Sequence, residues 1–359
     1  MIEDELRATF ARHETLTPEP GPLRAAIDRL AVRRRRRRFA LRAAGTVLAV
    51  LVTVSVPVMA RTLAAAPDPP RLGGTGSSST PAPAVVEGPL NFLVLGIDGE
   101  AGAEGNRADS VLMVHVPRDR DRIYLVALPR DLGVEIPGQG FDKLNSAFYY
   151  GSHRPGGKPD LAGGTELTAK TISKLVGVRF DGGATLTFTG LRRLTDAVGG
   201  VSICLDQPVR SVHTDRVFPA ACQRLGGSAA LDLLRQRYDL RAGAHDRDRN
   251  AERFAKALLG ELASRRTLTD PARLSAVIKE VGDGLVLDTG VRALPELLAV
   301  AGAVDGAETV GIGWSFNTDR TRGGAYERLD PAVSRSLFEA LRNDTLGAWV
   351  AANPGHVTR

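Results

Sequence analysis

The feature that most constrains this chain is an uncharged apolar run beside a block of arginines. Residues 33–38 are six consecutive arginines, and the eighteen residues of 43–60 carry no charge. A helix rises about 1.5 Å per residue and needs roughly 17 to 25 residues to cross a bilayer. The Arg42 side chain can reach the headgroups, so residues 39–42 extend the run. We therefore predict one transmembrane helix over 39–60.

Charge sets the expected orientation of this helix. Nearly forty residues precede the run, which favours a retained anchor over a cleavable signal peptide. The positive-inside rule makes residues 1–38 a basic cytoplasmic tail and places the chain after Arg61 outside the cell membrane. A buried core helix and a DNA-binding arginine arm are the less favoured alternatives. We expect a single-pass membrane protein with an extracytoplasmic C-terminal part.

The rest of the chain divides by composition. Residues 61–89 are rich in Pro, Gly and Ser, as in a solvated linker, and we assign 90–345 to one globular domain and 346–359 to a C-terminal tail. Residues 1–42 hold eleven arginines and six acids, leaving 36 basic and 35 acidic residues elsewhere. A nearly neutral domain argues against nucleic acid as a partner. The six histidines and two cysteines form no zinc motif.

Three short apolar runs indicate the fold class. Residues 91–98, 111–116 and 123–128 read as strands buried on both faces of a sheet. Helical spacing of apolar residues follows over 166–176, 191–198 and 249–262. Interleaved strands and helices predict an α/β fold, a layered α/β/α domain with a central mixed, partly parallel sheet.

Charged residues stand at the ends of these runs. Asp98 ends the first strand, Arg130 and Asp131 follow the third, and Arg107 and Asp109 lie in the expected loop before the second. Open α/β sheets bind ligands beyond the carboxyl ends of their strands. Carboxylates suit a divalent ion, and arginine suits phosphate oxygens. Turn-capping aspartates and a local Arg130–Asp131 salt bridge remain alternatives.

A second basic cluster surrounds Tyr238. It contains Arg235, Arg237, Arg241, Arg247 and Arg249. Arginine outnumbers lysine 41 to 6 in the chain, so a solvated helix face is the default interpretation for most of these residues. We find no nucleophile elbow and no Walker A motif.

The two cysteines are expected to form a disulfide. Cys204 and Cys222 both follow the predicted anchor, in an oxidising compartment, and seventeen residues with two prolines separate them. Closing a loop of this size stabilises a fold by about 3 kcal/mol in the chain-entropy model. The alternative is a pair of free cysteines.

Seven segments carry a resemblance to a known family. They are NFLVLGID, NRADSVLMVHV, ALPRDLGVEIPG, KLNSAFYYG, TDAVGGVSICL, LRQRYD and DRDRNAERFAKAL. In this order and spacing, over about residues 90–345, they resemble the LytR-CpsA-Psr family of cell-envelope proteins, of actinobacterial type. The resemblance implies a Mg²⁺-dependent phosphotransferase in cell wall assembly. Such an enzyme moves a glycopolymer from a polyprenyl-pyrophosphate carrier in the membrane onto peptidoglycan through a phosphodiester bond.

The resemblance also implies roles for individual residues. Asp98 and Asp109 would hold Mg²⁺. Pyrophosphate binding would fall to Arg107, Arg130, Arg235, Arg237 and Arg247, and catalysis to Arg130, Arg235, Arg237 and Asp246. The family places an acid near Ala244, two positions before Asp246, and Asn250 and Glu252 replace the usual Arg and Gln, which leaves the general base open. Apolar helices near the sheet would supply a slot for the carrier lipid.

Two other classes of function compete with this interpretation. One is a non-catalytic module that binds envelope glycan or lipid carrier, or a membrane-tethered regulator of the transcriptional attenuator type. The short, proline-interrupted N-terminal segment is unsuited to a helix-turn-helix. The other is an intracellular hydrolase of phosphate esters, which would not need an anchor.

Overall fold

The computed structural model of the chain describes residues 86–99, 106–236, 240, 243–288, 290, 294–304, 307–314, 316–320 and 324–358. The expected cytoplasmic tail, membrane helix and most of the linker lie outside these residues, as does Arg237. No helix in the described ranges combines the length and apolarity that a membrane crossing requires.

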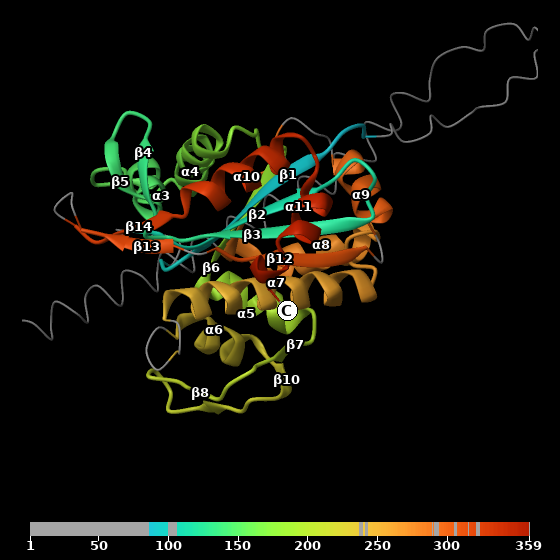
Figure 1. Cartoon of the computed structure of the whole chain (residues 1–359). Helices are drawn as coiled ribbons and strands as arrows, with labels where there is room; N and C mark the ends of the chain where they lie inside the picture. Colours follow the sequence, from blue (N-terminus) through green and yellow to red (C-terminus); the bar gives the residue numbers. More distant parts are fainter. Residues whose placement is uncertain are drawn as a thin grey trace, which may run out of the picture. The chain divides into compact units, whose positions relative to one another are not determined.

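The centre of the domain is a seven-stranded sheet in the order β11-β6-β1-β2-β3-β12-β15 (Figure 1). Its strands are β1 (Leu90–Ile97), β2 (Ala108–Val116), β3 (Arg122–Leu128), β6 (Gly182–Thr187), β11 (Leu285–Asp288), β12 (Glu308–Ile312) and β15 (Val357–Thr358). β1 runs parallel to β6 and β3 parallel to β12, whereas β2 is antiparallel to both of its neighbours. The predicted mixed, partly parallel sheet is confirmed.

Helices cover both faces of this sheet (Figure 1). One face packs against α3 (Leu144–Ser152), α4 (Leu161–Val176), α10 (Pro331–Arg342) and α11 (Leu346–Ala352). On the other side lie α5 (Phe188–Ala197), α6 (Gly227–Arg235), α7 (Ala244–Ser264), α8 (Pro271–Val281) and α9 (Leu294–Ala303). This is the expected α/β/α arrangement of layers.

Small strand pairs and short helices complete the fold. The pairs are β4 (Gly133–Ile136) with β5 (Gly140–Lys143), β7 (Val201–Cys204) with β10 (Cys222–Leu225), β8 (Val209–Arg210) with β9 (Val217–Phe218), and β13 (Phe316–Asp319) with β14 (Tyr326–Leu329). The short helices are η2 (Gly282–Gly284) and η3 (Pro354–His356). Cys204 and Cys222 face each other across β7 and β10 and are joined, so the predicted disulfide is confirmed.

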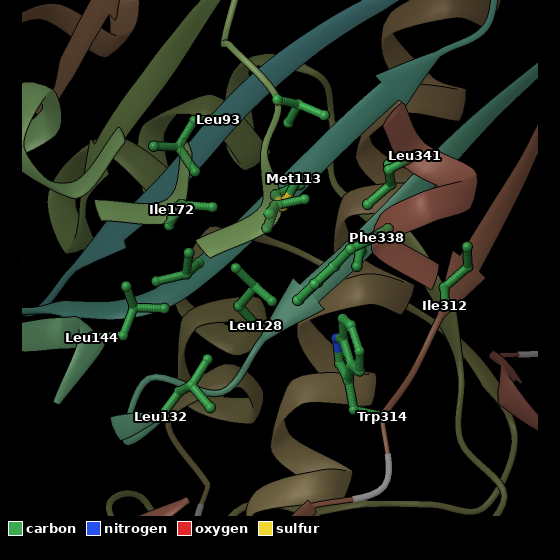
Figure 2. Close-up of a cluster of buried hydrophobic side chains, with 14 of the residues drawn as sticks. Leu93, Met113, Leu128, Leu132, Leu144, Ile172, Ile312, Trp314, Phe338 and Leu341 are labelled. Atoms are coloured by element: carbon green, nitrogen blue, oxygen red, sulfur yellow. The ribbon is translucent and has the colours of Figure 1, made fainter. Parts of the chain in front are cut away.

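The largest apolar core fills the space between the sheet and α3, α4, α10 and α11. Leu93 and Met113 from the strands meet Ile172 of α4 and Phe338 of α10 there (Figure 2). α4 begins at Leu161, five residues before the apolar pattern indicates, because the Asp160 side chain accepts a hydrogen bond from a first-turn N–H and caps the helix.

The C-terminal residues set apart as a tail lie within this core and sheet. Leu346 and Trp349 of α11 are buried in the main core. Strand β15 then pairs antiparallel with β12 and forms one edge of the sheet. Residues 346–358 are therefore part of the domain.

Candidate functional site

A bulge in the sheet places the first two acidic side chains. Asp98 directly follows β1, and the pairing of β1 with β2 passes from Gly96–Ser110 to Ile97–Ala108, which leaves Asp109 as an extra residue. Such a bulge re-aims its side chain. Asp109 thus belongs to strand β2, and the prediction that it lies in the preceding loop is wrong. Because β2 runs antiparallel to β1 and β3, its first residues lie where those strands end.

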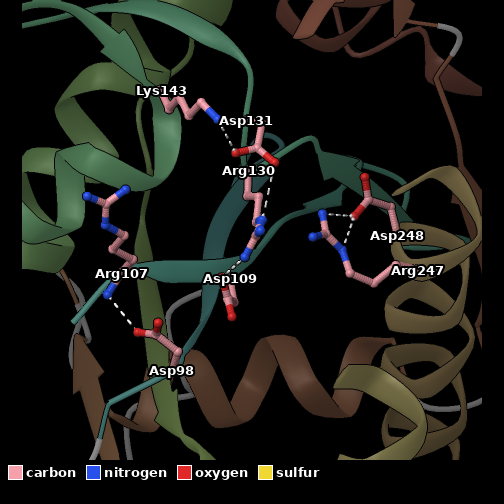
Figure 3. Close-up of polar contacts among 8 residues, drawn as sticks. All are labelled: Asp98, Arg107, Asp109, Arg130, Asp131, Lys143, Arg247 and Asp248. Carbon is pink, nitrogen blue, oxygen red and sulfur yellow. Dashed lines mark hydrogen bonds and ion pairs between the residues drawn. The ribbon is translucent and has the colours of Figure 1, made fainter. Parts of the chain in front are cut away.

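Arg130 follows the end of β3, at the edge of the sheet where Asp98 and Asp109 lie. Its Nη1 donates to Asp109 Oδ1, and its Nε donates to Asp131 Oδ2 at 3.3 Å, while Lys143 Nζ donates to Asp131 Oδ1 at 3.0 Å (Figure 3). Burial opposes the charged form of Arg130, but the charges of Asp109 and Asp131 outweigh burial and raise the pKa of Arg130. The site holds this guanidinium charged.

The arrangement of Asp98 bears on the expected metal. Burial raises the pKa of Asp98, the Arg107 N–H that donates to its Oδ1 at 2.8 Å opposes this shift, and the nearby charge of Asp109 adds to it. The described residues contain no cluster of three or more His, Cys, Asp or Glu side chains able to hold a metal. Mg²⁺ commonly takes one or two carboxylates and completes its shell with water and phosphate oxygens. Two carboxylates that repel each other at one cavity fit that requirement.

Helix α7 contributes a second ion pair. The Arg247 guanidinium donates from Nη2 and Nε to Asp248 Oδ1 at 2.8 and 3.2 Å (Figure 3). Both residues line the same cavity as Asp98 and Arg130. Asp246 lies elsewhere: it accepts from Gln207 Nε2 at 3.2 Å and lines a separate, smaller hollow.

Sequence reasoning therefore missed Asp248. Helical spacing contained a signal for it, because Asp248 shares one face of α7 with Ala251, Ala255 and Leu258, which also line the cavity. Asp246 does not fall on this face.

Asp98, Asp109, Arg130 and the Arg247–Asp248 pair all line one cavity of about 480 Å³. It lies between the sheet and helices α5, α6 and α7. Its walls are mostly apolar and include Leu112, Leu186, Leu191, Leu231, Phe254 and Leu258. Its charged side chains are Asp98, Asp109, Arg130, Arg235, Arg247 and Asp248. A ligand with a long apolar part and a compact anionic group matches this division.

The remaining predicted arginines differ in position. Arg235, the last residue of α6, lines the cavity with its guanidinium 5.1 Å from the centre of the Phe188 ring. Arg107 does not line the cavity; its guanidinium lies 5.9 Å from the Tyr149 ring centre, and its main chain supports Asp98. The structure thus brings Arg130, Arg235 and Arg247 together with the two aspartates.

Comparison with known proteins relates the chain to curated cell wall proteins. It is 30% identical over 238 residues to the cell wall biosynthesis protein LcpA of Corynebacterium glutamicum, covering 57% of this chain and 46% of LcpA. It is 27% identical over 224 residues to the polyisoprenyl-teichoic acid–peptidoglycan teichoic acid transferase TagU of Oceanobacillus iheyensis, covering 62% of this chain and 66% of TagU. The chain spans about half the length of LcpA.

The fold has solved counterparts. The crystal structure of B. subtilis TagV superposes with a TM-score of 0.57 at 19% identity, covering 73% of this chain and 98% of TagV. The family model of the LytR_cpsA_psr family matches residues 74–315, more than half of the chain. The chain belongs to the LytR_cpsA_psr family.

Proposed function

We propose that this protein is a phosphotransferase that moves a glycopolymer from a polyprenyl-pyrophosphate carrier onto peptidoglycan during cell wall assembly. The single observation that carries the proposal is the cavity, which combines apolar walls with a group of charged side chains, here called its charged mouth: Asp98, Asp109, Arg130, Arg235, Arg247 and Asp248. A polyprenyl pyrophosphate has the same two parts. The name of the relative TagU describes transfer of teichoic acid to peptidoglycan, and that of LcpA describes cell wall biosynthesis, which supports this class of function.

The charged mouth would stabilise the reaction electrostatically. In the proposed reaction, an acceptor hydroxyl attacks the phosphorus that bears the glycopolymer, and the bond to the carrier phosphate breaks. Arg130, Arg235 and Arg247 would bind the phosphate oxygens on which negative charge develops. Asp98 and Asp109 would hold Mg²⁺, which supplies Lewis-acid neutralisation of phosphate charge when bound.

Asp248 is the carboxylate best placed to accept the hydroxyl proton. It lines the cavity next to Arg247, and neither Asp98 nor Asp109 is available for this role if both hold a metal ion. Asp246, one of the catalytic residues predicted from the sequence, lines the separate hollow. We therefore assign the general base to Asp248.

The apolar wall of the cavity would hold the carrier lipid. We propose that residues 39–60 form a membrane anchor, with the tail of residues 1–38 in the cytoplasm and the domain outside the membrane. Such an anchor would keep the domain on the same membrane as the carrier.

The test is transfer of labelled polymer from a polyprenyl-pyrophosphate donor onto peptidoglycan oligomers by the full chain in detergent, with and without EDTA. We expect Mg²⁺-dependent formation of an acid-labile phosphodiester product. If the chain binds the donor but yields no product under any metal condition, the proposal of a transferase is wrong and a binding module replaces it.

A further inference from the structure

We propose that His213 is a further binding residue for the donor pyrophosphate, presented to the cavity by a loop whose main chain is held by a buried clamp of Ser211, Asp232 and Gln236. The inference rests on the proposed function, because it adds a contact in the same cavity. His213 lies in the loop between β8 and β9, and it lines the cavity together with Arg235.

The first half of the clamp fixes the main chain of the loop through Ser211. The Ser211 hydroxyl donates to Asp232 Oδ1 at 2.6 Å and accepts the N–H groups of His213 and Thr214 at 3.0 and 3.1 Å. The Thr214 hydroxyl donates to the other oxygen of Asp232. Ser211 and Asp232 are buried, so these bonds lie away from water, where they hold geometry firmly.

Gln236 forms the second half. Its side-chain Oε1 accepts the N–H of Val212 at 3.0 Å, and its Nε2 donates to the Ser211 hydroxyl at 3.0 Å and to Asp232 Oδ1 at 3.0 Å. Gln236 is fully buried and directly follows Arg235. The clamp therefore ties the loop to the segment that presents an arginine to the same cavity.

Charge at the mouth explains why a further donor is useful. Arg130 is already engaged by Asp109 and Asp131, and Arg247 by Asp248. These ion pairs use part of the N–H groups of Arg130 and Arg247, so the several acceptor oxygens of a pyrophosphate can take a further donor beside the arginines. A histidine ring always offers at least one N–H donor, and a second when it is protonated.

The clamp fixes the main chain from which the exposed His213 side chain projects. The N–H groups of Val212, His213 and Thr214 are all hydrogen bonded to side chains of the clamp. The disulfide between Cys204 and Cys222 closes the longer segment that contains β8, this loop and β9. Preorganisation of this kind increases affinity because less ordering is needed on binding.

The experiment measures binding of geranylgeranyl pyrophosphate and geranylgeranyl monophosphate to the full chain in detergent. We expect His213→Ala to weaken binding of the pyrophosphate probe about tenfold, the usual scale for losing a hydrogen bond to a charged group. Binding of the monophosphate should weaken less. Arg216→Ala is the matched control, because Arg216 lies in the same loop beside Phe218 and does not line the cavity. Its affinity should stay within about twofold of the unmutated protein.

A double-mutant cycle tests the clamp. Ser211→Ala should reproduce part of the His213→Ala defect, and the double variant should bind no more weakly than His213→Ala alone, because the clamp acts through the ring. Additive losses would show that Ser211 acts independently of His213 and overturn the clamp. Thermal unfolding of each variant separates this effect from misfolding.

Two further outcomes separate this inference from the proposed function. If folded His213→Ala binds the pyrophosphate probe as tightly as the unmutated protein does, the role of His213 is overturned and the transferase proposal stands. If the unmutated protein neither binds the probe nor transfers polymer, both proposals are wrong.

Discussion

Two apolar hollows lie along helix α7, and they differ in what stands beside the apolar walls. The first, of about 480 Å³, includes Phe254 and Leu258 in its wall and carries both acidic and basic side chains. The second, of about 340 Å³, is lined by Leu259, Ala263 and Val304 and has Arg266 but no carboxylate among its lining residues. Apolar space alone follows from imperfect packing of helices on a sheet. Opposite charges at the edge of the first hollow give it a candidate chemistry.

The charges gather there because of the strand topology. β1 and β3 end at one edge, and β2 begins there, so Asp98, Arg130 and the bulged Asp109 converge. The second hollow lies farther along α7, where Ile123 near the start of β3 and Thr309 near the start of β12 form part of its wall.

The largest expected effect is on the transfer rate, when the Arg130 guanidinium is removed from the charged mouth. Arg130→Ala should leave a folded protein that transfers polymer about 10²- to 10³-fold more slowly, because alanine cannot stabilise charge in the transition state. Arg130→Lys should recover little, since an ammonium group cannot make the two-pronged contact. The measurement is the transfer rate with thermal unfolding in parallel. Near-normal transfer by folded Arg130→Ala would remove this residue from the mechanism.

The second prediction compares two aspartates on α7. Asp248→Asn should slow transfer by about 10²-fold, the lower range for losing a general base. Asp246→Asn, the matched control two residues away, should stay within about twofold of the unmutated rate because Asp246 lies outside the cavity. The reverse pattern would contradict the assignment to Asp248 and make Asp246 the general base.

The third prediction concerns a buried acid on the face of α7 that packs against the sheet. Burial raises the pKa of Glu252 to about 7, against a hydrogen bond from the Ala127 N–H at 3.4 Å. The folded state therefore binds this proton more tightly than the unfolded chain does. The stability gained from the protonated acid is complete below about pH 4.5 and is lost as pH rises to about 7.

Glu252→Gln should remove this pH dependence. We expect the variant to be more stable than the unmutated protein by about 2–3 kcal/mol at pH 8, and the difference to shrink towards zero near pH 4.5. Denaturant unfolding across this pH range is the measurement, with the exposed Glu308→Gln as control. A difference that is constant with pH would show that Glu252 does not titrate in this way.

The smallest expected effect is on lipid affinity, when a larger side chain is placed in each hollow in turn. Ala255→Leu should weaken binding of geranylgeranyl pyrophosphate about tenfold, because the larger side chain prevents roughly two methylene groups of the lipid from being buried. Binding of inorganic pyrophosphate should not change. Ala263→Leu is the matched substitution in the second hollow and should change neither affinity. Equal losses from both variants would contradict the assignment of the lipid to the first hollow.

The sequence predicted the parts of the site that depend on local pattern. Apolar runs mark where strands β1 and β3 end, so Asp98 and Arg130 were found at one edge. The bulge at Asp109 depends on pairing between strands, which no local pattern shows. The start of α7 at Ala244 determines which acid faces the cavity. The sequence does not predict this start, because the charged residues around it show no apolar periodicity.

Tertiary contacts explain the other differences. His213 reaches the cavity because buried side chains of α6 and the residue after it hold its loop, and the sequence around His213 resembles any polar loop. Trp349 is buried through packing of α11 on the main core, although its segment follows the last long amphipathic helix. Such contacts depend on elements far apart in the chain.

The most direct test of the account maps where the lipid binds. A geranylgeranyl pyrophosphate carrying a benzophenone on its tail would be crosslinked to the full chain, and the labelled residues identified by mass spectrometry. We predict labels on the apolar wall of the first hollow, at Leu191, Phe254 and Leu258, which Ala255→Leu reduces and which excess inorganic pyrophosphate also reduces by competing for the charged side chains. Labels confined to Leu259, Ala263 and Val304 of the second hollow would contradict the account.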